Sequence, residues 1–174
     1  VVHKGKTIFV GDTSVHEYPT SEQMADIAIS AARVVRLFGF DPKVAFVSHS
    51  TFGQPLTNRT KHIKTAVEIL KGKNVDFEFD GDMQPDVALD KEYQNLYPFS
   101  KIVGNANILI MPGQHSAAIS YKMMKTLGDT KVIGPLLIGL GLPIEIAPLR
   151  TSTSEILNLA SIAAYSADII DYKK

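Results

Sequence analysis

Two hydrophobic patterns alternate along the chain, short apolar runs and longer repeats with helical spacing. From Met24 to Phe38 and from Ile63 to Leu70, apolar residues recur every three or four positions, which predicts amphipathic helices. The order strand, helix, strand, helix is typical of right-handed βαβ units in a mainly parallel sheet. The short runs that predict the strands are residues 7–12, 43–48, 76–81 and 107–113.

Capping signals mark where several of the predicted helices begin. Thr20 is followed three residues later by Gln23, and Ser152 by Glu155, and each pair forms a capping box ahead of an apolar repeat. The glycines that follow three of the repeats are helix C-terminal signals; they are Gly39, Gly72 and Gly128. The other helices are predicted at about 116–127 and 153–170, with a short one near 84–95.

Two predicted strands contain stretches that are apolar on both faces, "VAFV" and "ILIM". Such strands are typical of a sheet covered by helices on both sides. The sequence therefore predicts an α/β fold with three layers, α/β/α, around a mostly parallel sheet. Residues 131–148, "KVIGPLLIGLGLPIEIAP", add two β-like runs broken by glycine and proline. Gly134 and Pro135 there fit either close approach of a ligand or tight turns at the sheet edge.

Polar residues follow four predicted strands, at the edge where open parallel sheets bind ligands. We expect these residues to lie along one edge of the sheet. They are Asp12 and Thr13, Ser48 to Thr51 with Gly53 beyond, Gly81 and Asp82, and finally Gly113, Gln114, His115 and Ser116.

The amino-acid composition argues against several classes of function. Lys and Arg number 18, and so do Asp and Glu, so the net charge of zero argues against a nucleic-acid-binding surface. The chain has no cysteine, which excludes disulfides and zinc thiolate sites. Because no signal peptide and no long apolar run stands out, we expect a cytoplasmic domain that binds no membrane. Val1 is not Met and a strand pattern starts by Thr7, so we expect either a fragment of a longer protein or a processed chain.

Catalysis by a serine nucleophile and binding of a metal are both disfavoured by spacing. A nucleophile elbow needs G-x-S-x-G, whereas Ser48 and Ser50 lie in "VSHST" without flanking glycines. A histidine next to a serine in sequence cannot usually serve as its base. His16, His49 and His115 could each lie at a strand end, but no H-x-x-x-H or H-x-H spacing is typical of a metal site here, and we predict none.

Anion binding is the chemistry that these loops favour. Hydroxyls and backbone N–H groups between a parallel strand and a helix suit a phosphate. Ser48, Ser50, Thr51 and Gly53 fit this arrangement, and so does the segment 113–116. Helix caps and turns use the same residue types, so a purely structural role for these residues is the alternative. Neither a P-loop nor G-x-G-x-x-G is present, and the loops therefore do not predict a nucleotide site by motif.

Five stretches together resemble the carboxyl half of the phosphate acetyl/butyryltransferase family. They are "PTSEQMADIAISAA" (19–32), "PKVAFVSHSTFG" (42–53), "NILIMPGQHSAAIS" (107–120), "IGPLLIGLGLPIEI" (133–146) and "TSEILNLASIAA" (153–164). Within the family, "HEYPT", "SHSTFG" and "MPGQHSAAIS" look most like the phosphotransacetylase-like module at the end of large bacterial NADP-dependent malic enzymes.

The resemblance implies a two-lobed α/β/α module of the isocitrate-dehydrogenase-like kind, with acetyl-CoA or a related acyl-CoA between its lobes. Residues 1–147 would form the second lobe, and 148–174 would hold a helix that returns to a first lobe. Dimers or higher homo-oligomers are implied as well. No cofactor is expected in this chain, while NADP and a divalent metal would belong to other domains of the parent malic enzyme.

The chain departs from the active transferases at their catalytic positions. Those enzymes carry Ser-Arg-Gly where this chain has Pro148, Leu149 and Arg150. Aligned from the downstream Ile156, the catalytic Arg becomes Leu149, whereas a shift of one residue makes it Arg150. The family's catalytic Asp falls on Glu155, for which we favour the capping-box role. The loop after the fourth strand lacks the family's carboxylate, and "SHSTFG" is shorter and poorer in glycine than its counterpart.

Two functions follow from the resemblance and its departures. The first is a regulatory module whose site is catalytically degenerate but still binds acetyl-CoA, with Ser48, Ser50, Thr51, Gly53, Gly113–Ser116, Gly134 and Pro135 as candidate ligand-binding residues. Loss of a preorganised cation would impair the transfer chemistry and leave an acyl-CoA pocket in place. The second is an active phosphate acetyltransferase that exchanges acetyl between CoA and phosphate. A purely structural dimerisation module is the third possibility.

Overall fold

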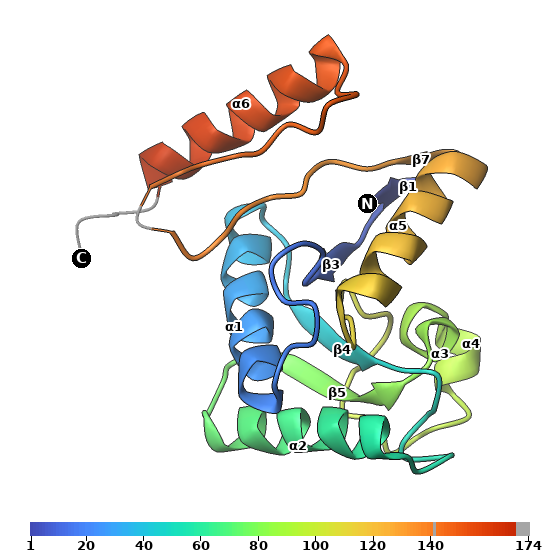
Figure 1. Ribbon diagram of the computed structural model, residues 1–174. Helices are drawn as coiled ribbons and strands as arrows, with labels where there is room; N and C mark the ends of the chain where they lie inside the picture. The colour runs from blue at the N-terminus through green and yellow to red at the C-terminus, as the bar shows by residue number, and fades with distance from the viewer. Residues whose placement is uncertain (141, 170–174) are drawn as a thin grey trace.

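A four-stranded sheet forms the centre of the fold in a computed structural model that describes residues 1–140 and 142–169 (Figure 1). The strands are β3 (Phe9–Gly11), β4 (Lys43–Val47), β5 (Glu78–Met83) and β6 (Ile108–Ile110), in the spatial order β3-β6-β4-β5. All three strand pairs are parallel. The predicted parallel sheet is therefore confirmed.

The carboxyl ends of the central strands lie level with one another. Ile110, the last residue of β6, pairs with Gly11 of β3 and with Phe46 of β4. Consequently, the loops that follow these strands leave the sheet at one edge, as predicted. The third strand extends further than its pattern indicated, because β5 reaches Met83, so Asp82 lies within the strand rather than after it.

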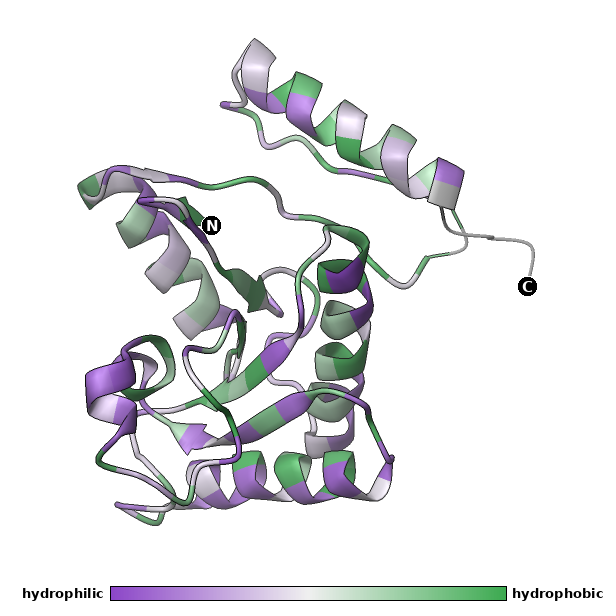
Figure 2. Cartoon of the chain, turned by 180° about the vertical axis from the view of Figure 1, so that it is seen from behind, coloured by the Kyte–Doolittle hydropathy of each residue, from purple (hydrophilic) through white to green (hydrophobic). Residues whose placement is uncertain are grey.

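Two helices, α1 (Ser21–Leu37) and α2 (Asn58–Gly72), cover one face of the sheet. The capping box of α1 forms as predicted, with Thr20 and Gln23 bonding each other's backbone N–H. Helix α2 has a capping box of its own, between Thr57 and Thr60. Apolar and polar residues alternate along α2, in keeping with one face on the sheet and one in solvent (Figure 2).

The other face of the sheet is covered by α3 (Pro85–Leu89) and α5 (Gln114–Leu127), with α4 (Lys91–Gln94) next to α3. Alternation along β4 divides the core between the faces. Val44 and Phe46 pack toward α1 and α2, whereas Ala45 and Val47 pack toward α3 and α5. The three-layer α/β/α fold is confirmed.

Two segments expected to form strands do so only in part. Residues 7–12 contain β3, but Lys6–Thr7 forms β2, which pairs with β1 (Val2–His3) in a small antiparallel sheet completed by β7 (Thr130–Lys131). The β-like runs in 131–148 do not form the strands that their pattern indicated; Leu136 and Glu145 make one isolated bridge. Gly134 and several prolines interrupt this segment, and a β pattern forms a strand only where another strand offers a ladder.

Helix α6 (Thr153–Ile169) stands apart from the sheet at the end of a long extended segment (Figure 1). Its predicted capping box forms, because Ser152 N donates to Glu155 Oε2 (2.7 Å) and Glu155 N donates to Ser152 Oγ (3.3 Å). The predicted last residue, Ile170, lies outside the described residues. Tyr165 Oη donates to the carbonyl oxygen of Leu37 (3.1 Å) and joins α6 to the end of α1. The boundary between 1–147 and 148–174 stays a prediction.

Candidate functional site

The loop after β4 is fastened to the end of β5 by hydrogen bonds. Ser50 Oγ donates to the carboxylate of Asp82, and Gln84 N donates to Thr51 Oγ1 (3.2 Å). The backbone adds two bonds, from Ser48 N to Met83 O (2.9 Å) and from Phe52 N to Asp82 O. Ser50 is fully buried, and Ser48 and Thr51 are nearly so. The hydroxyls therefore hold the loop in place, and Ser50 donates to a carboxylate rather than to a histidine.

Asp82 is the central residue of this arrangement, and it was named in the sequence only as a strand-end residue. Its side chain is fully buried. One carboxylate oxygen accepts from Ser50, while Oδ1 has no hydrogen-bond partner among the described residues. Its partner Ser50 lies 32 positions away, so no local pattern could have identified it.

The loop after β6 is built around a close backbone approach at Gly113. A Cβ atom there would lie 2.8 Å from the carbonyl oxygen of Glu17, which only glycine avoids. That same oxygen accepts from Gln114 N (3.1 Å), and Ser116 Oγ donates to Gly113 O (2.8 Å). His115 is exposed and stacks on the ring of Tyr18 with a centroid distance of 6.2 Å. This loop thus joins the start of α5 to the segment before α1.

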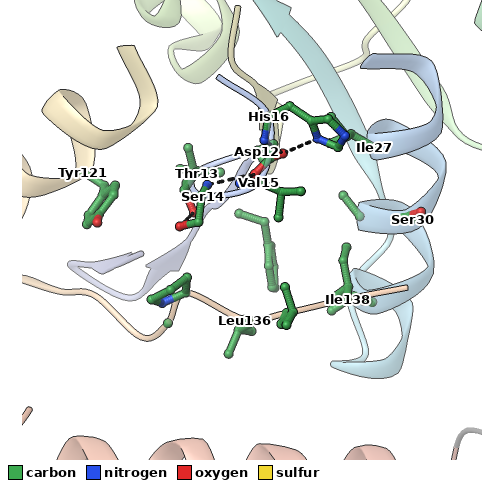
Figure 3. Close-up of a pocket in the computed structure, with 18 of the residues that line it drawn as sticks. Asp12, Thr13, Ser14, Val15, His16, Ile27, Ser30, Tyr121, Leu136 and Ile138 are labelled. Carbon is green, nitrogen blue, oxygen red and sulfur yellow. Dashed lines mark hydrogen bonds and ion pairs between the residues drawn. The ribbon is translucent and has the colours of Figure 1, made fainter. Parts of the chain in front are cut away.

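A cavity of about 440 Å³ lies beside β3, between α1 and the extended segment 132–138 (Figure 3). Ile27 and Ser30 line it from α1, Tyr121 from α5, and Leu136 and Ile138 from the extended segment. Gly134 and Pro135, two of the predicted ligand-binding residues, line it as well. The loops at 48–53 and 113–116 do not line it.

Asp12 and His16 form the polar end of this cavity. Asp12 Oδ1 accepts from Ser14 N (2.9 Å) and Val15 N (3.0 Å), and Oδ2 accepts from His16 N (2.9 Å). His16 Nδ1 lies 2.7 Å from the same Oδ2. Burial raises the pKa of Asp12, but the hydrogen bonds from Ser14, Val15 and His16 outweigh it and leave the pKa below its ordinary value.

A second, smaller pocket of about 110 Å³ is lined by residues that align with the catalytic positions of the transferases. Arg150 and Glu155 both line it, as does Lys125 of α5. Lys125 Nζ donates to Glu155 Oε1 (2.8 Å). This bond and those from Ser152 lower the pKa of Glu155 to about 2. Leu149 is fully exposed and does not line the pocket.

The two pockets adjoin along one stretch of backbone. Val132, Ile133 and Gly134 line both of them, so this stretch forms their common wall. Gly134 adopts a φ of 122°, a conformation that residues with a Cβ rarely adopt. Sequence reasoning named Gly134, Pro135, Arg150 and Glu155 here. It did not identify Lys125, because a lysine near the C-terminus of a helix has no distinctive sequence signal.

Metal-ligating side chains do not gather in the part of the chain that the structure describes. No three His, Asp or Glu side chains there come close enough to hold an ion. His16 bonds to Asp12, while His115 stacks on Tyr18. Within the same residues, no helix is long and apolar enough to cross a membrane.

Comparison with known proteins places the chain in a family. Residues 1–164 match the family described as phosphate acetyl/butaryl transferase. An NADP-dependent malic enzyme from Rhizobium meliloti is 48% identical over 164 residues, which are 94% of this chain and 22% of that enzyme. A phosphate acetyltransferase from Clostridium acetobutylicum is 36% identical over 162 residues, 92% of this chain and 49% of the other.

Solved structures give the same result. The EutD phosphotransacetylase from Staphylococcus aureus superposes with a TM-score of 0.89 at 29% identity, over 95% of this chain and 52% of that protein. The chain thus spans about a fifth of the malic enzyme and about half of the phosphotransacetylases. The resemblance predicted from the motifs is confirmed, and the chain belongs to the phosphate acetyl/butyryl transferase family.

Proposed function

We propose that this chain is part of a phosphotransacetylase-like module that binds acetyl-CoA and regulates an NADP-dependent malic enzyme. The observation that carries the proposal is the pair of adjoining pockets. The small pocket offers the guanidinium of Arg150 beside the Lys125–Glu155 ion pair, and the larger cavity that adjoins it is mostly apolar. Acyl-CoA has anionic phosphates at one end and an uncharged thioester at the other, and therefore matches both.

Two features favour regulation over catalysis. Leu149, which one alignment places at the catalytic Arg, carries no charge, is fully exposed and does not line the small pocket. Glu155 is held by Lys125 and Ser152, and a carboxylate with a pKa of about 2 is a poor proton acceptor near neutral pH. A site of this kind can still bind an anionic group of acyl-CoA through the guanidinium of Arg150.

Regulation requires acetyl-CoA to bind two states of the malic enzyme with different affinity. The parent enzyme would hold NADP and its divalent metal in other domains, act in the cytoplasm, and assemble as a dimer or higher homo-oligomer. The apolar residues exposed on α6, such as Ile156, Leu157 and Tyr165, would then be covered within that assembly.

The test uses the full-length parent enzyme. Malate oxidation is measured against acetyl-CoA concentration for the wild type and for Arg150→Ala. We expect acetyl-CoA to inhibit the wild type and the variant to need about tenfold more of it, because removing one charge-assisted contact costs about 1.5–3 kcal/mol. Arg33→Ala on α1, which lines neither pocket, is the matched control. Equal responses of Arg150→Ala and wild type would remove the small pocket from the proposal.

An active phosphate acetyltransferase is the second candidate, favoured by Arg150 in the small pocket and by the likeness to the clostridial phosphate acetyltransferase. Its reaction joins the acetyl group of acetyl-CoA to phosphate and releases CoA as the thiol. The same full-length protein is given acetyl-CoA and phosphate, and acetyl phosphate is measured. Steady turnover that Arg150→Ala abolishes would establish this candidate and exclude a purely regulatory site.

A further inference from the structure

We infer that an exposed aromatic and basic surface beside β5, an outer strand of the sheet, binds the catalytic part of the parent malic enzyme. By catalytic part we mean the domains that oxidise malate. The residues of this β5-edge surface are Phe52, Leu56, Lys64, Tyr97, Phe99 and Lys101. The inference rests on the proposed regulation and adds the contact through which the module would control the enzyme.

Three aromatic rings form the centre of the β5-edge surface. Between ring centroids, Phe52 lies 4.8 Å from Phe99 and 5.5 Å from Tyr97, and Tyr97 lies 6.1 Å from Phe99. Phe99 is nevertheless 64% exposed, and so is 57% of Leu56, which follows the turn that carries Phe52. Large apolar side chains gathered on a surface mark a site that another protein covers, and aromatic rings are enriched in such interfaces.

Both halves of the surface are fastened to β5. The segment that carries Phe99 is held because Lys101 N donates to Asp80 Oδ2 (2.7 Å). The loop that carries Phe52 is held because Phe52 N donates to Asp82 O (2.6 Å). Side chains that are already in place lose little conformational entropy when a partner binds, so the surface is prepared for binding.

Phe52 reaches the surface from a strained backbone conformation. Its φ is 50° and that of Gly53 is 82°, in a two-residue turn closed by hydrogen bonds between Thr51 and Gln54. Glycine, asparagine and aspartate suit such a turn, whereas a bulky residue with a positive φ is strained. Strain of this kind is found mostly at functional sites. The ring of Phe52, rather than the turn, therefore accounts for a phenylalanine at this position.

The surface carries unpaired positive charge. Lys64 Nζ lies 3.9 Å from the place that a Cβ atom of Gly53 would take, next to Phe52. The hydrogen bond from Lys71 lowers the pKa of Glu68, and the charges of Lys101 and Lys64 add to this effect. Neither Lys64 nor Lys101 has an ion-pair partner among the described residues. Charge complementarity thus requires acidic residues around an apolar patch on the partner.

The position of the surface favours the catalytic part as its partner. None of the surface residues lines either pocket. Figures 1 and 2 both show α2 and β5 at the opposite end of the molecule from α6. Neither acyl-CoA nor a first lobe joined by α6 would therefore cover the surface. The chain spans 22% of the Rhizobium malic enzyme, so most of such an enzyme lies outside it and can supply the partner.

The loop that carries Phe52 also connects the surface to the strand-end edge of the sheet. Ser50 and Thr51 of this loop are hydrogen-bonded to Asp82 and Gln84, at the end of β5. A shift of the loop at the strand-end edge would move the ring of Phe52 on the surface. This is the contiguous path that control of a distant catalytic part needs.

The experiment uses the full-length parent enzyme. Malate oxidation is measured against acetyl-CoA concentration, and the dissociation constant of acetyl-CoA is measured by calorimetry. In Phe99→Ala and in Lys101→Glu, acetyl-CoA should lose at least about half of its effect on malate oxidation and still bind within ~10-fold of its wild-type affinity, because only the coupling is weakened. Arg33→Glu, a charge reversal on α1 outside the surface, should respond like the wild type.

Cross-linking identifies the partner. A carbodiimide joins an amine directly to a neighbouring carboxylate, and mass spectrometry locates the joined residues. We expect Lys64 or Lys101 to be joined to an aspartate or glutamate of the catalytic part, and we expect Phe99→Ala to lower the yield of that product. Phe99→Leu replaces Phe99→Ala if circular dichroism shows that the smaller side chain prevents folding.

The outcomes separate this inference from the proposed function. A full response to acetyl-CoA in both surface variants overturns the inference alone. Loss of acetyl-CoA binding in these variants also overturns it, because the surface would then belong to the ligand site. Cross-links only to a second copy of this module assign the surface to an interface between copies, and cross-links at neither lysine exclude the catalytic part. If the wild type neither binds acetyl-CoA nor responds to it, the proposed function itself fails.

Discussion

Asp12 shows how a short loop can build a polar site from its own backbone. Three consecutive backbone N–H groups, from Ser14, Val15 and His16, converge on one carboxylate. The His16 ring adds a fourth contact. The charge is thereby satisfied locally, and the loop after β3 is held rigid at the rim of the cavity.

Replacing Asp12 with Asn should destabilise the protein in a pH-dependent way. The amide keeps one acceptor but turns an N–H₂ group toward His16, so we expect a loss of about 1–3 kcal/mol in the free energy of unfolding at pH 7. The pKa of Asp12 is lowered in the folded state, so its contribution is present above the ordinary value of 3.8 and is lost as the pH falls through the folded value.

Urea unfolding of both proteins from pH 7 down to pH 3 measures the difference. The difference in unfolding free energy should be constant near pH 7 and should decrease as the pH approaches 3. Asp41→Asn, at an exposed position whose side chain has no hydrogen-bond partner among the described residues, is the control and should change little at any pH. A difference for Asp12→Asn that is independent of pH would show that the lost charge is not the cause.

Elements defined by local pattern could be predicted from the sequence, and elements defined by a distant partner could not. Helix α1 and its cap follow from spacing and from Thr20 and Gln23, which act within one turn. The β-like runs of 131–148 have equally good local patterns, yet only Leu136 and Glu145 find a bridge. A strand requires a neighbour, and periodicity gives no information about where that neighbour lies.

The same distinction between local pattern and distant partner holds for the residues of the candidate site. Gly134 and Arg150 were named from the chain and do line pockets, whereas Ser50 and Thr51 were named for their hydroxyls and prove to be buried. Sequence placed the hydroxyls at the correct edge of the sheet. It could not indicate that β5 would bond to them, because Asp82 and Gln84 lie more than thirty residues further along.

Glu145 gives a prediction for the extended segment. Burial raises its pKa, although a weak hydrogen bond from Leu137 N (3.4 Å) lowers it slightly. An acid with a raised pKa binds more protons when folded, so it costs stability as the pH rises above the unfolded value near 4.5. Glu145→Gln removes that cost and should stabilise the protein at pH 7 but not at pH 4.

Thermal unfolding of the wild type and of Glu145→Gln at pH 4 and at pH 7 tests the direction of this effect on stability. Exposed Glu92→Gln is the control and should show no such crossover. A stabilisation of equal size at pH 4 and pH 7 would mean that ionisation of Glu145 is not responsible.

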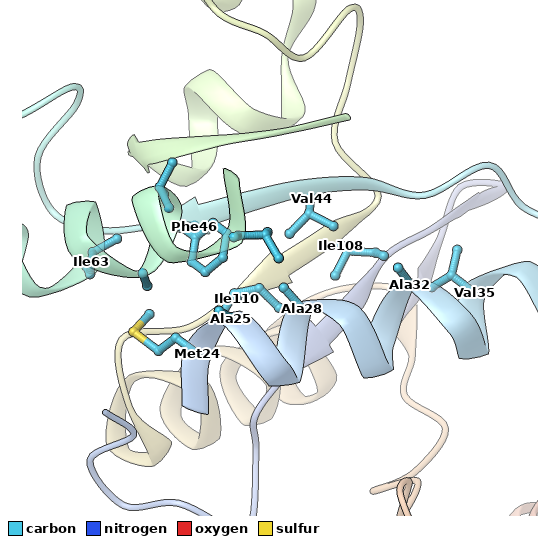
Figure 4. Close-up of a cluster of buried hydrophobic side chains, with 13 residues drawn as sticks. Met24, Ala25, Ala28, Ala32, Val35, Val44, Phe46, Ile63, Ile108 and Ile110 are labelled. Carbon is cyan, nitrogen blue, oxygen red and sulfur yellow. The ribbon is translucent and has the colours of Figure 1, made fainter. Parts of the chain in front are cut away.

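At the scale of the whole molecule, stability is concentrated around the parallel sheet. On one face of the sheet, side chains of α1, α2 and the strands interdigitate, among them Ile63, Phe46 and Ile110 (Figure 4). Ile63→Ala should cost about 2–5 kcal/mol of unfolding free energy, because it leaves a cavity at a nearly fully buried position. Leu96→Ala at an exposed position should cost under about 0.5 kcal/mol. Urea titration resolves the two, and equal losses would contradict this assignment of the core.

Helix α6 contributes little to that core, which leads to a prediction about the proposed boundary near residue 148. Among the described residues, the buried apolar side chains all lie before residue 118, with the exception of Leu159. Burying one leucine is worth about 1.5–3 kcal/mol. A chain ending at Arg150 should therefore keep a cooperative unfolding transition and lose less than about 3 kcal/mol. Loss of the transition would show that α6 is integral to the sheet domain, and that the chain does not divide near residue 148.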